Sequence, residues 1–71
     1  MTIFSKNLRR VRDGKGWTQG RAAKKIGVKR ATYAAYEEGR SLPRALVFVK
    51  LMRVYDIIDL SFVDSEEFKM N

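Results

Sequence analysis

Residues 16–39 read GWTQGRAAKKIGVKRATYAAYEEG, and this stretch decides the fold. Thr18 is a residue type that caps the start of a helix, and Gly27 suits the left-handed conformation at which a helix ends. Ala23 is small enough to let a second helix cross closely, and Val28 has the place of a buried turn residue. The spacing therefore predicts two short helices joined by a tight turn.

Apolar spacing and end signals predict five helices and an all-α fold. The helices span about residues 2–13, 18–26, 30–38 and 43–55, with a short fifth helix from near Asp59. We expect Gly14 and Gly16 to end the first helix, and Pro43 to be the first residue of the fourth. One domain over residues 1–64 and a short acidic tail over residues 65–71 complete the predicted organisation.

The same periodicity predicts the core. Tyr33 and Tyr36 are expected to point inward from the third helix. The predicted buried face of the fourth helix consists of Leu46, Val49, Met52 and Tyr55. Trp17 is expected to cover the junction of the first two helices, a core position that we favour over a ligand role.

Composition limits the function classes. The 71 residues include no cysteine and no histidine, so we expect one small domain with no metal site and no cofactor. Without these residues or a glycine-rich phosphate loop, neither an enzyme nor a small-molecule substrate is expected. The longest apolar run, residues 45–49, is far too short to span a membrane, so a cytoplasmic protein is expected.

Charge is unevenly distributed. Residues 1–55 contain fourteen Lys or Arg and three acids, whereas residues 56–71 contain five acids and one Lys. A basic body suits a polyanion partner, and the alternative is that surface lysines only maintain solubility.

Several positions together indicate a known family. They are Arg12, the pair Thr18-Gln19, the pair Gly27-Val28, residues 36–40 (YEEGR) and Pro43. This pattern resembles the helix-turn-helix domains of phage repressors and Cro proteins, the lambda-repressor-like or Xre-type family, over roughly the first sixty residues. The resemblance implies a compact five-helix domain whose third helix lies in the major groove of double-stranded DNA. It implies a sequence-specific, repressor-like transcriptional regulator, and the alternative is a protein-interaction adaptor or an antitoxin subunit of the same fold.

The side of the third helix opposite the tyrosines is predicted to face DNA. Its residues are Arg30, Ala31, Ala34 and Ala35, which match positions at which repressors of the resembled family touch base edges. Arg30 can donate two hydrogen bonds to guanine O6 and N7, and alanine methyl groups can pack on thymine methyl groups. The alternative is that Arg30 contacts only phosphate and that the alanines merely allow close approach.

Phosphate contacts are expected around that helix. The predicted residues are Gln19, Arg21, Lys29, Thr32, Arg40 and Arg44, and a solvated surface position is the alternative for the cations. Gln19 resembles the family glutamine that binds a backbone phosphate. By the same resemblance, Arg12 and Glu37 form a structural ion pair. Glu38 is expected to weaken DNA binding unless it turns toward Arg40.

A homodimer is predicted because one short helix reads only a few base pairs. The predicted interface is a second apolar stripe of the fourth helix with the region after it: Val47, Leu51, Val54, Ile58, Leu60 and Phe62. By the resemblance, such proteins usually pair through the region after the fourth helix. Two copies then place their third helices about 34 Å apart on a palindromic site. The alternative is a monomer in which the stripe packs under the fifth helix.

Overall fold

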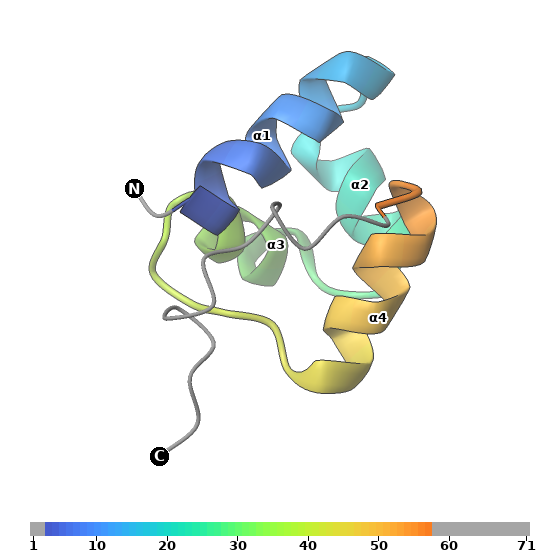
Figure 1. The fold of residues 1–71 in the computed structure, drawn as a ribbon. Helices are drawn as coiled ribbons and strands as arrows, with labels where there is room; N and C mark the ends of the chain where they lie inside the picture. Colours follow the sequence, from blue (N-terminus) through green and yellow to red (C-terminus); the bar gives the residue numbers. More distant parts are fainter. Residues whose placement is uncertain (1–2, 58–71) are drawn as a thin grey trace.

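The structure, a computed structural model, describes residues 3–57 and shows an all-α fold in that range (Figure 1). Its four helices are α1 (Ile3–Lys15), α2 (Gln19–Ile26), α3 (Arg30–Glu37) and α4 (Ala45–Val54). α3 lies against both α1 and α2, and α4 lies against α2. The fifth helix expected from near Asp59 and the acidic tail lie outside the described residues. Within residues 3–57, no helix combines the length and the apolar character needed to cross a bilayer.

One apolar core joins the four helices. Its buried members are Phe4, Leu8, Ala22, Ala23, Ile26, Tyr33, Tyr36, Leu51 and Tyr55. The predicted inward positions of Tyr33 and Tyr36 are confirmed, with 0% and 5% of each residue exposed. Trp17 is half-buried and packs against this core, with its ring centroid 5.6 Å from that of Tyr55. Each fully buried large apolar side chain stabilises the fold by about 1.5–3 kcal/mol.

The turn between α2 and α3 forms as the sequence predicts. The Thr18 Oγ1 accepts a hydrogen bond from the Arg21 N–H at 3.1 Å and so caps α2. Gly27 has φ +88°, in the left-handed region where a side chain costs about 1–2 kcal/mol. The N–H groups of Gly27 and Val28 both donate to the carbonyl of Ala23, at 2.8 and 3.0 Å. These bonds close the end of α2, and α3 begins after the short turn.

α1 runs two residues further than predicted, because Gly14 continues the helix. The end is set by Gly16, whose φ of +72° is left-handed. The Gly16 N–H donates to the Asp13 carbonyl at 3.0 Å, and the Trp17 N–H donates to the Arg12 carbonyl at 3.3 Å. This pair of bonds is a Schellman motif, which requires a left-handed residue directly after the helix.

The predicted start of α4 is wrong. Pro43 is buried and precedes the helix, and Arg44 is the N-cap residue. Arg44 keeps an extended backbone, with ψ 162°, so the first helical bond joins the Phe48 N–H to the Arg44 carbonyl at 2.8 Å.

The predicted buried face of α4 is wrong for Leu46 and Val49, whereas Tyr55, its last member, is buried in the core as predicted. The stripe expected at a dimer interface packs on the core instead, and its residues are Val47, Leu51 and Val54. Leu51 is 0% exposed, whereas Leu46 and Val49 of the predicted core face are 69% and 46% exposed. The stacking of Phe48 on Phe4, with ring centroids 6.0 Å apart, accompanies this orientation. Leu51 is therefore unavailable to a second copy, and Val47 and Val54 are partly buried against the core. The other predicted interface residues, Ile58, Leu60 and Phe62, lie outside the described residues.

Candidate nucleic-acid interface

α3 presents a small outer face. Arg30, Ala31 and Thr32 are exposed, and Ala34 is half-buried. Ala35 is buried, with 9% exposure, so its prediction as a base-contacting residue is wrong. After α3 the chain turns back, and the Arg40 N–H donates to the Ala35 carbonyl at 3.0 Å. The outer face of α3 therefore carries one long cation, Arg30, beside the small side chains of Ala31, Thr32 and Ala34.

The side chain of Arg30 lies across the first turn of α2. A Cβ atom at Gly20 would lie 3.6 Å from the Arg30 Cδ and 3.9 Å from its Nε. The stem of the arginine therefore runs next to a position that has no side chain. A methyl group fits at these distances, whereas a longer side chain would compete with the arginine for the same space. The sequence did not predict this contact, because it joins two helices.

Cations lie at three helix starts. Arg21 lies in the first turn of α2, and Lys29 and Arg44 are the N-cap residues of α3 and α4. Neither N-cap side chain makes a capping hydrogen bond, and no acid lies in the first turn of any of the four described helices. Because helix N-termini carry unsatisfied N–H groups and the positive end of the helix dipole, they favour an anion. Phosphate has the chemistry that suits these positions.

Arg40, another predicted phosphate ligand, is exposed in the turn after α3. Its Nε donates to the Glu38 Oε1 at 2.6 Å. Glu38 thus turns toward Arg40, the orientation that lessens its repulsion of a phosphate.

Glu37 is the centre of a polar network inside the domain. The residue is 0% exposed and accepts two hydrogen bonds from Arg12, at 2.6 Å from Nε and 3.1 Å from Nη2. Gln19 donates to the same carboxylate at 3.1 Å, and the Arg9 Nε lies 3.6 Å from it. Arg12 also donates to the Trp17 carbonyl at 2.8 Å. The ion pair that the resemblance implies is therefore present, whereas the contacts of Gln19 and Arg9 with it were not predicted.

Arg12 and Glu37 both stay charged in this network. Burial alone raises the pKa of Glu37, but the hydrogen bonds from Arg12, Gln19 and Tyr33 and the charge of Arg12 hold that pKa below its ordinary value. The hydrogen bond to Glu37 raises the pKa of Arg12. One N–H of the Gln19 amide is committed to Glu37, so the amide predicted to bind phosphate is held in place from inside the protein.

A second buried contact connects α3 with the end of α4. The hydroxyl oxygens of Tyr33 and Tyr55 lie 2.7 Å apart. Burial raises the pKa of both groups, so both stay protonated and one donates to the other. Within residues 3–57, every buried side-chain nitrogen or oxygen has a hydrogen-bond partner. A fully satisfied network of this kind holds α3 rigidly against its neighbours.

Three relatives show what the chain is similar to. An HTH-type transcriptional regulator of Archaeoglobus fulgidus is 39% identical over 62 residues, which are 84% of this chain and 89% of that protein. YqaE of Bacillus subtilis, also named an HTH-type transcriptional regulator, is 34% identical over 55 residues, which are 78% of this chain and 47% of YqaE. The antitoxin HipB of Escherichia coli K12 is 32% identical over 56 residues, which are 79% of this chain and 64% of HipB.

The chain spans about half of YqaE and less than two thirds of HipB. No solved structure matches it. The profile of the helix-turn-helix family matches residues 8–63, a range that includes the whole of α2, α3 and α4. The helices α2 and α3 and the turn between them occupy the residues that the sequence predicts for this motif. The chain belongs to the helix-turn-helix family.

Proposed function

We propose that the protein binds double-stranded DNA sequence-specifically, with α3 in the major groove, and acts as a repressor-like transcriptional regulator in the form of a homodimer. The outer face of α3 carries the proposal, because a single long cation among small residues allows a groove wall to approach closely. Cations at the starts of α2, α3 and α4 support it, and so do two relatives that are named transcriptional regulators.

In this proposal the contacts divide into two kinds. Arg30 donates to guanine O6 and N7, and the methyl groups of Ala31 and Ala34 pack on thymine methyl groups. Phosphates neutralise Arg21 and Lys29 and accept from helix N–H groups, which positions the protein without reading sequence. The network around Glu37 preorganises this surface by joining α1, α2 and α3.

The relative HipB is named an antitoxin, which favours a second candidate function. In that case the chain is an antitoxin subunit whose surface binds a partner protein. The two candidates differ in salt response, because each phosphate contact steepens the fall of log K with log salt by about 0.9. A protein-binding surface without phosphate contacts lacks this response for duplex DNA.

Selection of sites from a random duplex pool, followed by titration at several salt concentrations, tests the proposal. Arg30→Ala should lower affinity for the selected site by about 1–3 kcal/mol and relax the preference at one base pair per half-site. Arg44→Ala should weaken all duplexes alike and reduce the salt slope by about one. Lys50→Ala removes the same charge from α4 and is the matched control.

Two results would count against these assignments. If the selected sequence logo is the same for Arg30→Ala and the wild type, Arg30 does not read a base. If the wild type shows no salt-dependent duplex binding, the antitoxin function is the better candidate.

A further inference from the structure

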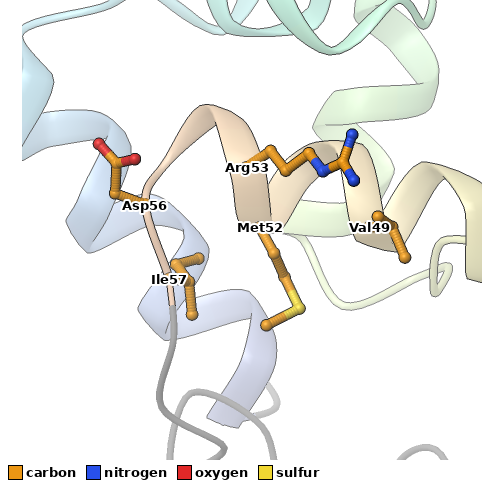
Figure 2. Close-up of a pocket in the computed structure, with 5 residues that line it drawn as sticks. All are labelled: Val49, Met52, Arg53, Asp56 and Ile57. Atoms are coloured by element: carbon orange, nitrogen blue, oxygen red, sulfur yellow. The ribbon is translucent and has the colours of Figure 1, made fainter.

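α4 turns an apolar face toward solvent. Leu46 and Val49, which the sequence assigns to the core, are exposed. Beside them lies a groove of about 410 Å³, lined by Val49, Met52, Arg53, Asp56 and Ile57 (Figure 2). Figure 2 shows the three apolar side chains in a row, with the two charged side chains along one edge of it. The groove therefore combines an apolar surface with one charge of each sign.

The backbone at the end of α4 holds this groove in one shape. The Asp56 N–H donates to the Arg53 carbonyl at 3.3 Å, and the Ile57 N–H donates to the Met52 carbonyl at 2.8 Å. Asp56 has φ +55°, the left-handed position of a Schellman motif, which suits glycine better than any residue with a side chain. Aspartate is one of the few residue types with a side chain that tolerates this conformation, so the backbone accommodates Asp56 here.

Asp56 is the acid of residues 3–57 that has no ion pair. The other three, Asp13, Glu37 and Glu38, pair with arginines at 2.6 to 3.5 Å. Arg53 likewise makes no ion pair with any residue in that range. Among residues 3–57, therefore, neither charge at the edge of the groove has an ion-pair partner.

We infer that a second copy of this chain occupies the groove, related by a two-fold axis, so that Arg53 of each copy pairs with the partner subunit's Asp56. A two-fold interface brings the same patch to both sides, so the patch must be complementary to itself. The groove meets this requirement, because one rotation pairs both charges and sets the two apolar rows together. A basic partner would instead oppose Arg53, and an acidic partner would oppose Asp56.

This interface specifies the homodimer of the proposed function, and it includes Val49 and Met52, which the sequence assigns to the core. It replaces the buried stripe of α4 with the opposite face of the same helix. Pairing through α4 leaves the outer face of α3 open on both copies. Because the interface contains no DNA contact, it is tested without DNA, and its failure leaves the proposed DNA binding standing.

Sedimentation velocity of the full chain without DNA tests the inference. The wild type should change from monomer to dimer as its concentration rises through the micromolar range. Arg53→Glu and Asp56→Lys should each weaken self-association by at least about tenfold, because like charges then face each other twice in the dimer. An equimolar mixture of the two variants should regain a dimer, because a mixed pair restores an opposite charge at both contacts.

Two controls separate the interface from the fold. Asp56→Asn keeps a residue type that tolerates the left-handed position, so it should weaken association without lowering the melting temperature. Lys50→Glu changes an exposed charge of α4 outside the groove and should leave association unchanged. A wild type that is monomeric throughout would overturn the inference. Dimers that are insensitive to the groove variants, or variants that mixing does not restore, would equally overturn it.

Discussion

Replacing Glu37 by Gln tests the network that holds α3 in place. The substitution keeps the shape of the side chain but removes the charge to which Arg12 donates at 2.6 and 3.1 Å. Removing one partner of a buried ion pair costs about 3–5 kcal/mol. The Arg12 side chain keeps 15% exposure and its bond to the Trp17 carbonyl, so part of its charge is still solvated or hydrogen-bonded in the variant. We therefore expect a loss near the lower limit, about 3 kcal/mol.

This loss is large enough to measure in two ways. In a domain of this size each kcal/mol shifts the melting temperature by about 4–8 °C, so the expected decrease is about 12–24 °C. Urea unfolding followed by the fluorescence of Trp17, the single tryptophan, gives the free energy directly. Glu38→Gln is the matched control, because it neutralises the adjacent but exposed acid, whose pair with Arg40 is worth at most about 1 kcal/mol. Equal melting temperatures for Glu37→Gln and the wild type would refute the reasoning.

The loss of stability in Glu37→Gln should depend on pH. The folded state holds the pKa of Glu37 below its ordinary value of 4.5, to which the unfolded chain returns. A carboxylate of this kind stabilises the fold fully above its unfolded pKa, and the contribution disappears as pH falls through the folded pKa. The difference in unfolding free energy between wild type and Glu37→Gln should therefore narrow below pH 4.5. A difference that stays constant from neutral to acidic pH would show that the charge of Glu37 is not the cause.

Further predictions concern single positions. Gly20→Ala should select the same DNA sequence as the wild type, because a methyl group fits beside the side chain of Arg30. Gly20→Leu should change the preference at the base pair that Arg30→Ala relaxes, and site selection with the three variants tests this. Tyr55→Phe removes a buried hydroxyl that lies 2.7 Å from its partner and should lower the unfolding free energy by about 1 kcal/mol, so an unchanged urea midpoint would contradict it. Gly27→Ala should cost about 1–2 kcal/mol because φ is +88°. Gly14→Ala, at a helical position with equally open space, should instead stabilise by up to about 1 kcal/mol, and melting temperatures decide between these signs.

The sequence by itself determined the two helices and the turn between them. Thr18 and Gly27 mark the start and the end of α2 because caps and left-handed residues act within a few positions along the chain. The inward positions of Tyr33 and Tyr36 followed from helical spacing. The pairing of Arg12 with Glu37 came from the family resemblance, since no local rule joins residues so far apart in the chain.

Only the tertiary structure decided which surfaces these helices expose. Residues 45–49 of α4 are apolar without interruption, so periodicity allows more than one buried face, and complementary packing selects one of them. Ala35 is buried, although helical spacing places it opposite Tyr33 and Tyr36. The contacts of Gly20 with Arg30 and of Gln19 with Glu37 join different helices. Helical spacing states that one face is buried, but what lies against that face depends on how the helices pack.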